Sequence, residues 1–245
     1  MKTTVDITTR DGTCPAAVFR PDDQAKYPAV IVYMDGLGYG PPIEQIAERI
    51  AKHGYVVLAP DLFYRARPYE RAHMSMFADP EKRKQWFEKM MVAASTDKVM
   101  SDMEAYLAYL DSRGDVAGTK VGITGYCMGG RLALAAAGHF PDRVAATTSY
   151  HPGNIATDAP DSPHKLADKI KAKVYVGGAS EDPSFPEEQK QRLDEALTKA
   201  GVAHTIETYP AKHGWTMPDT PVYDAACAER HFETMLAAFD SVLRK

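Results

Sequence analysis

Cys127 lies between two glycines at a spacing that suits a nucleophile. The segment 125–130, GYCMGG, follows a β-branched run ending at Thr124 and precedes small, helix-favouring residues. A sharp turn from strand to helix strains the backbone of its central residue, and glycines two residues to either side avoid collisions with the neighbouring chain. Gly125 and Gly129 occupy these places. The pattern predicts a strand–turn–helix that presents the Cys127 thiol as a nucleophile.

The same turn would place Cys127 at the amino end of a helix. Free amides and partial positive charge at that end favour a thiolate and stabilise an oxyanion. We therefore expect the Met128 amide to be one donor of an oxyanion hole. An ordinary strand–helix turn around a buried cysteine would have the same local sequence. A base and an acid elsewhere in the chain are needed to favour the nucleophile over this alternative.

A histidine and two carboxylates follow later strands. His213 comes soon after the β-branched run 204–209 and is a natural general base. Asp182 and Glu181 follow the run 173–177, and either carboxylate could orient the imidazole. The resulting order of nucleophile, acid and histidine is that of α/β-hydrolase triads.

A third group of side chains could reach the same region. Tyr150 is the last residue of the run 144–150, and His151 follows it. Both would lie at the same carboxyl edge of the sheet and could line a pocket. A metal site built from His151, His164 and His213 would lack the paired ligand spacing of known metal motifs. We expect neither a metal nor a cofactor.

The elements that must position these residues alternate between strands and helices. Eight strands are predicted at 4–9, 16–20, 29–34, 55–59, 120–124, 144–150, 173–177 and 204–209. Apolar residues at helical spacing predict helices near 43–53, 96–113, 186–200 and 224–243. A charged helical piece is expected near 81–91, and the small, helix-favouring run 132–137 follows the turn at Cys127. This alternation predicts an α/β fold with a mostly parallel sheet of about eight strands and helices on both faces.

Length and composition set the class of protein. We expect residues 1–245 to form one domain, because α/β folds of this size need not divide. The 44% hydrophobic and 25% charged residues are typical of globular proteins. The net charge of −4, with both signs interleaved, argues against nucleic-acid binding.

Location and assembly are predicted from what the sequence lacks. The first residues have no apolar signal core, and no apolar run approaches the ~18 residues of a membrane span. We expect a cytoplasmic protein without membrane contact, monomeric by default and with a homodimer as the alternative. The widely separated Cys14, Cys127 and Cys227 fit neither a disulfide framework nor paired metal ligands.

Together, the motifs resemble the dienelactone hydrolase (carboxymethylenebutenolidase) family of α/β-hydrolases. They are GYCMGG at 125–130, SEDP at 180–183, KHGW at 212–215 and PDLFYR at 60–65. The resemblance spans nearly the whole chain, and a cysteine in the elbow separates this family from the commoner serine hydrolases. It implies an α/β-hydrolase fold with Cys127, Asp182 and His213 as the catalytic triad.

The resemblance also implies roles for the segment 33–38, YMDGLG. Dienelactone hydrolases proper have a glutamate in this loop that contacts the resting thiol and helps to activate it. Asp35 stands in that place here, one methylene shorter. The Gly36 amide would be the second oxyanion donor.

The arginine with which the family binds a substrate carboxylate is replaced in this chain. It would lie shortly after the histidine, where Met217 stands. Arginines of the long insertion 60–95 could supply a cation instead. The expected substrate-binding residues are Tyr64, Arg65, Arg67, Arg83, Tyr150 and Trp215.

These features predict a hydrolase that opens a lactone or small carboxylic ester through an acyl-enzyme on Cys127. A thiolate is both a good nucleophile and a good leaving group, which favours activated esters over amides. A general short-chain carboxylesterase or thioesterase is the alternative, favoured by Met217 and by apolar residues of the insertion. A thiol-based binding or sensing protein without hydrolysis is a further alternative.

Overall fold

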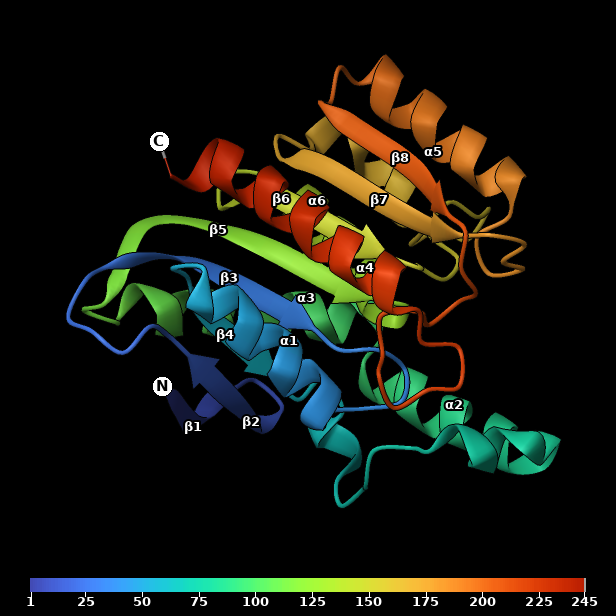
Figure 1. Cartoon of the computed structure of the whole chain (residues 1–245), viewed down its shortest axis with the longest axis horizontal. Coiled ribbons are helices and arrows are strands. Elements are labelled where there is room, and N and C mark those ends of the chain that lie inside the picture. Colours follow the sequence, from blue (N-terminus) through green and yellow to red (C-terminus); the bar gives the residue numbers. More distant parts are fainter. Residues whose placement is uncertain (245) are drawn as a thin grey trace.

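The computed structural model describes residues 1–244 and contains one eight-stranded sheet (Figure 1). Residue 245, the last of the predicted domain, lies outside the described residues. The strands are β1 (Lys2–Thr9), β2 (Gly12–Phe19), β3 (Tyr27–Tyr33), β4 (Val56–Pro60), β5 (Val116–Tyr126), β6 (Val144–Tyr150), β7 (Lys173–Ala179) and β8 (His204–Tyr209). Their order is β1-β2-β4-β3-β5-β6-β7-β8. Strands β3 to β8 run parallel, and only the pairings of β1 with β2 and β2 with β4 are antiparallel.

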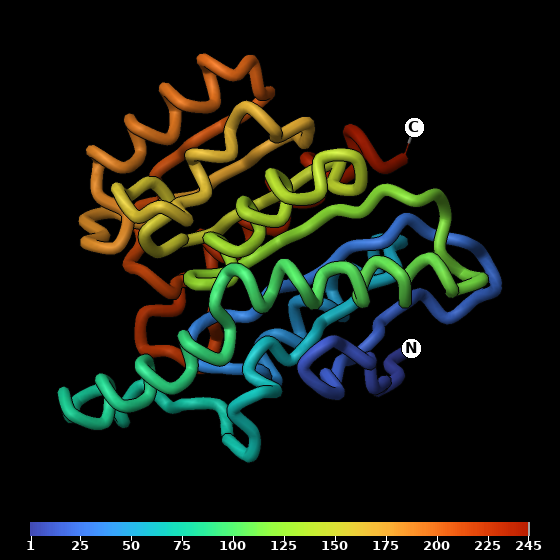
Figure 2. Tube along the Cα trace, turned by 180° about the vertical axis from the view of Figure 1, so that it is seen from behind, coloured from blue at the N-terminus to red at the C-terminus, as the bar shows by residue number. Residues whose placement is uncertain are grey.

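Helices cover both faces of this sheet. They are α1 (Pro41–Lys52), α2 (Pro80–Ala93), α3 (Thr96–Asp111), α4 (Met128–His139), α5 (Glu187–Lys199) and α6 (Ala225–Leu243). Three short 3₁₀ segments span Tyr64–Ala66, Met74–Ala78 and Pro163–Lys169. Helices α1 and α6 lie on one face, while α3 and α4 lie on the other, which Figure 2 shows from behind. Within residues 1–244, no helix is both long and apolar enough to cross a bilayer.

The predicted fold class is confirmed, because all eight predicted strands form in a mostly parallel sheet. The largest shift in a parallel strand is in β5, which begins at Val116 instead of 120. Val116 pairs with Tyr27 ahead of a register shift in the β3–β5 ladder, and the sequence pattern does not reveal this extension. The charged helix predicted near 81–91 is α2.

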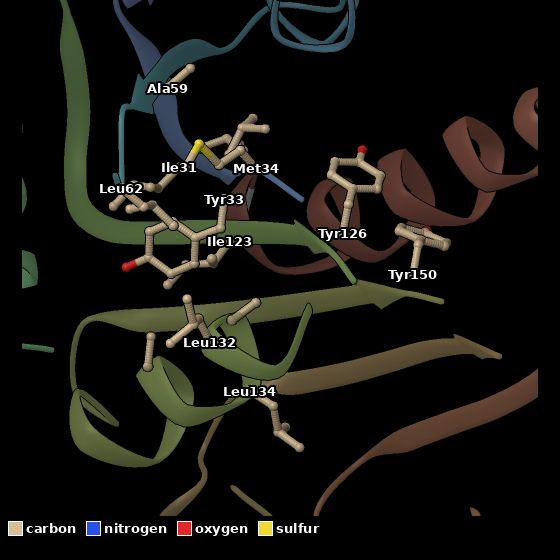
Figure 3. Packing of buried hydrophobic residues seen from close by; sticks show 14 of the residues in the cluster. Ile31, Tyr33, Met34, Ala59, Leu62, Ile123, Tyr126, Leu132, Leu134 and Tyr150 are labelled. Atoms are coloured by element: carbon tan, nitrogen blue, oxygen red, sulfur yellow. The ribbon is translucent and has the colours of Figure 1, made fainter. Parts of the chain in front are cut away.

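The centre of the sheet is buried on both faces, as expected for parallel strands that helices cover. Every residue of β4 and all but the first two of β3 are buried. Figure 3 shows Ile31 of β3, Ile123 of β5 and Leu132 of α4 in the apolar packing between sheet and helix. This close packing gives the carboxyl ends of β3 and β5 a rigid base.

The insertion between β4 and α3 is anchored by a buried ion pair. Arg65 Nη1 and Nη2 each lie 2.8 Å from an oxygen of Asp102, which is fully buried on α3. The Tyr64 hydroxyl donates to the same carboxylate over 3.2 Å. From this anchor the chain continues to α2, which lies beyond the end of the sheet to which the β5 arrowhead points (Figure 1).

We expect Asp102→Asn to destabilise the protein by roughly 3 kcal/mol, because it removes the buried countercharge of Arg65 and leaves the mostly buried guanidinium with only the more exposed Asp11 as a partner. Urea unfolding would measure the loss. The matched control is Asp111→Asn, which removes a more exposed ion pair with Arg143 and should cost less than about 1 kcal/mol. Equal losses in the two variants would contradict the anchoring role.

Candidate active site

Cys127 occupies a strained turn between β5 and α4. Its φ of 54° and ψ of −115° lie where side-chain-bearing residues are rare. A Cβ added to Gly125 would lie 2.0 Å from the Gly129 carbonyl oxygen, and one on Gly129 would lie 2.4 Å from the Met34 carbonyl oxygen. Only glycine fits either position, so the GxCxG spacing produces the sharp turn.

His213 and Asp182 meet beside this turn. His213 Nδ1 lies 2.6 Å from Asp182 Oδ2, and the Ser184 amide donates to Asp182 Oδ1 over 2.8 Å. Asp182 is buried, whereas Glu181 is exposed, so the structure places Asp182 and not its neighbour against the imidazole. The loops after β5, β7 and β8 thus bring the three predicted triad residues together.

The electrostatics of these residues favour charge separation. Burial of the His213 ring opposes the imidazolium form, but attraction to the Cys127 thiolate and hydrogen bonds with Asp182 and Cys127 outweigh it. Together these effects raise the pKa of His213 to about 10. Burial also opposes the Asp182 carboxylate, yet bonding to His213 and Ser184 lowers the pKa of this carboxyl group. The arrangement can hold a thiolate–imidazolium pair.

Cys127 and His213 open onto one pocket of about 550 Å³. Its wall is largely apolar and comes from the loop after β3, the insertion, the elbow and the segment after β8. The lining residues are Asp35, Gly36, Leu37, Met74, Phe77, Phe87, Cys127, His151, His213, Gly214, Met217, Thr220 and Val222. Within residues 1–244, no three His, Cys, Asp or Glu side chains are grouped as a metal site requires.

Two backbone amides are available next to the thiol. Neither the Gly36 nor the Met128 amide has a hydrogen-bond acceptor among residues 1–244. The Trp86 indole, on α2, donates to the Gly36 carbonyl oxygen over 2.8 Å and so orients that peptide. The predicted oxyanion donors are thus free to bind an oxygen, and Trp86 is a supporting residue that the sequence did not reveal.

Asp35 is held by an arginine that sequence analysis did not single out. Arg71 Nη1 and Nη2 lie 2.6 and 2.9 Å from the two Asp35 oxygens, and the Leu37 amide donates to the same carboxylate. Burial raises the pKa of Asp35, and the bonds from Arg71 oppose this shift. Arg71 lies in the same insertion as the three arginines considered earlier, and nothing in the local sequence distinguishes it from them.

Comparison with known proteins assigns the family. Residues 14–243 match the sequence profile described as "Dienelactone hydrolase family". The chain belongs to the dienelactone hydrolase family. It is 30% identical over 98% of its length to the whole of a Synechocystis sp. protein named "Putative carboxymethylenebutenolidase". These matches identify the chain as a hydrolase.

Solved structures share the fold of this dienelactone hydrolase family member. A crystal structure named "Putative Dienelactone Hydrolase" from Klebsiella pneumoniae has a TM-score of 0.84 at 23% identity, with 98% of each chain covered. A dienelactone hydrolase from Anabaena variabilis has a TM-score of 0.70 at 17% identity, covering 99% of this chain and 98% of its own. At these identities the likeness supports the α/β fold alone.

None of the six residues predicted to bind substrate lines the pocket of this dienelactone hydrolase family member. Tyr64 and Arg65 are bound to Asp102 at the start of the insertion. Arg67 pairs with Asp61 through Nε at 2.7 Å, and Arg83 is exposed on α2. These four side chains of the insertion therefore lie outside the wall of the pocket that holds the thiol.

Tyr150 and Trp215 lie under the site and outside the pocket. Both are fully buried. The Tyr150 hydroxyl donates to the His231 carbonyl oxygen over 2.9 Å, and Trp215 stacks on Tyr209. The last five residues of β6 are all buried, so the sequence pattern could not tell core from pocket at Tyr150. Trp215 lies in the segment after β8, where no strand pattern indicates the direction of its side chain.

His151 lines the pocket, the position considered for it from the sequence. Its ring centroid is 5.0 Å from that of His213, and its Nε2 lies 2.7 Å from Thr216 Oγ1. Burial, with the neighbouring His213 and His231, holds the pKa of His151 well below the usual histidine range. His151 therefore stays neutral beside the charged imidazole.

We expect Gly125→Ala to destabilise the protein by about 3 kcal/mol or more, since its methyl group would overlap the Gly129 carbonyl. Gly114→Ala is the control, because a Cβ there meets nothing within 4 Å, and it should change stability by less than about 0.5 kcal/mol. Urea denaturation measures both. A well-folded, fully stable Gly125→Ala variant would be inconsistent with this turn.

We expect Cys127→Ala to lower the pKa of His213, because the thiolate attraction and the Cys127 hydrogen bond both disappear. NMR titration of the His213 ring would measure it. In the wild type, the raised pKa of His213 stabilises the folded protein. This contribution is complete below about pH 6.5, the pKa of an unfolded histidine, and is lost as the pH rises through about 10. An unchanged pKa in the variant would show that the thiol does not interact with the ring.

Proposed function

We propose that this family member hydrolyses a small carboxylic ester or lactone through an acyl-enzyme on Cys127. One observation carries the proposal: the Asp182–His213 pair, joined at 2.6 Å, opens onto the same pocket as the cysteine of the strained turn. A nucleophile, a base and an orienting acid are the parts that acyl transfer requires.

In the first half-reaction the Cys127 thiolate attacks the carbonyl carbon. The amides of Gly36 and Met128 stabilise the oxyanion of the tetrahedral intermediate. As the intermediate collapses, the C–O bond breaks and the His213 imidazolium donates its proton to the departing alkoxide. The products are a thioester on Cys127 and a neutral imidazole.

In the second half-reaction His213 acts as the base. It takes a proton from water, which attacks the thioester through a second tetrahedral intermediate. The C–S bond then breaks, the acid leaves and the thiolate–imidazolium pair is restored. Asp182 stays ionised throughout and keeps Nε2 of the ring directed toward the reacting atoms.

A short-chain carboxylesterase or thioesterase is the second candidate. The apolar wall favours it, because Met217 and the insertion residues Met74, Phe77 and Phe87 offer contacts to an alkyl chain. Its chemistry is the same as that of lactone opening, so a substrate profile separates the two. A thiol sensor would instead be oxidised without turning over any ester.

The test is turnover of p-nitrophenyl acetate and dihydrocoumarin, an uncharged ester and an uncharged lactone. We expect Cys127→Ala and His213→Ala each to lower kcat/KM by roughly 10³-fold or more. The control Cys227→Ala removes the α6 cysteine and should keep the wild-type rate. Intact mass after acid quenching should show an acyl adduct that Cys127→Ala lacks.

Either of two results would contradict the proposal. One is wild-type protein that turns over neither compound while its thiol reacts readily with peroxide, which supports the sensor. The other is a Cys127→Ala variant as active as wild type, which places the chemistry elsewhere.

A further inference from the structure

We infer that the active site selects substrates with an uncharged acyl group, and that the ion-pair cluster Asp35–Arg71–Asp219 excludes acyl groups that carry a carboxylate. The inference rests on the proposed function and narrows its substrate class. It is based on the positions of the lysine and arginine side chains. Among residues 1–244, no lysine or arginine lines the pocket.

Arg71 contacts the pocket wall through Asp35, and its hydrogen bonds are already used. It makes two bonds to Asp35, with Nη1 at 2.6 Å and Nη2 at 2.9 Å. Its Nε lies 2.8 Å from Asp219 Oδ2, and Nη1 also bonds to the Gly38 carbonyl oxygen. The guanidinium thus has little capacity left for a substrate carboxylate.

The position of Arg71 is fixed by tight surroundings. Its side chain is 8% exposed. A Cβ on Gly40 would lie 2.7 Å from Arg71 Cδ, so the glycine provides the space that the side chain fills. The Ala72 amide bonds to the Leu37 carbonyl oxygen over 2.8 Å and ties the arginine's backbone to the Asp35 loop. Turning Arg71 toward a substrate would strip two carboxylates of their partner.

The charge of the cluster is unfavourable for an anion. Two carboxylates and one guanidinium leave a net charge of −1, and Asp35 itself lines the pocket. A carboxylate on the acyl group would be repelled at short range in surroundings of low dielectric constant. It would also lose hydration against Phe77, Phe87 and Met217 without gaining a partner. An alkyl or keto group of the same size has neither cost.

The experiment compares two esters that differ in one terminal group. These are p-nitrophenyl hemiglutarate, which ends in a carboxylate, and p-nitrophenyl 5-oxohexanoate, which ends in a methyl ketone of similar size. After subtraction of uncatalysed hydrolysis, we expect wild type to favour the ketone ester in kcat/KM by at least about tenfold at low ionic strength. The preference should shrink as salt is added.

Two variants test whether the charge of the cluster causes the preference for the ketone ester. Asp219→Asn makes the cluster neutral, and its site is about one-third exposed, so the fold should tolerate it. Asp35→Asn/Asp219→Asn leaves Arg71 as an uncompensated cation. We expect the ratio of ketone to carboxylate ester to fall by about fivefold or more in the single variant and to fall further in the double variant.

The matched control is Asp22→Asn. Asp22 is exposed on the β2–β3 connection, at the opposite end of the parallel strands, and its loss changes the net charge of the protein equally. Both esters should keep their wild-type rates in this variant. A ratio that moves here as much as in Asp219→Asn would mean that only the overall charge matters.

The outcomes separate this inference from the proposed function. Equal use of both esters by wild type, with activity lost in Cys127→Ala, overturns the inference and leaves the thiol hydrolase intact. A strong ketone preference that neither cluster variant alters overturns the role of the cluster. If wild type hydrolyses neither ester, nor the uncharged compounds tested above, the proposed function fails and this inference fails with it.

Discussion

The close approach of three backbone segments at the elbow is the constraint on which the rest of the site depends. The carbonyl of Gly129 lies against Gly125, and the carbonyls of Tyr33 and Met34 lie against Gly129. This contact joins the end of β3 to the start of α4. The loop that carries Gly36 and the turn that carries Cys127 are therefore placed by one packing interaction, and a side chain at either glycine would push them apart.

Two clusters of charge flank the thiol and have different partners. The Asp182–His213 pair lies on the β7–β8 side, where its two side chains are joined at 2.6 Å. The Asp35–Arg71–Asp219 cluster lies on the other side and fastens the loop after β3 to the insertion and to the segment after His213. Asp182 is paired with His213, whereas Asp35 and Asp219 share Arg71, and these pairings limit the repulsion between the carboxylates.

The sequence predicted the elements well, and the structure brings the predicted triad residues Cys127, Asp182 and His213 to one place. The glycine spacing follows from short-range sterics, the strand–helix alternation from the burial of apolar faces, and the order of the three residues along the chain from the α/β-hydrolase pattern. The pocket wall was harder to predict. The insertion folds back through long-range contacts such as Arg65 with Asp102, and only these decide which arginine faces Asp35. Tyr150 and Trp215 were placed in the pocket wall for a related reason. Tyr150 ends a strand that is buried on both faces, and Trp215 lies in a segment without regular structure, so at neither position does the sequence pattern tell core from pocket.

The hydrogen bond from Trp86 to the Gly36 carbonyl joins two parts of the molecule that could otherwise change independently. Trp86 belongs to α2, and its neighbour Phe87 forms part of the pocket wall, while Gly36 is the proposed second oxyanion donor. During evolution, replacements in α2 that admit a new substrate would also disturb the Gly36 peptide. Diversification of this enzyme should therefore favour changes at Met74 and Phe77, which shape the same wall from outside α2, and should retain the tryptophan.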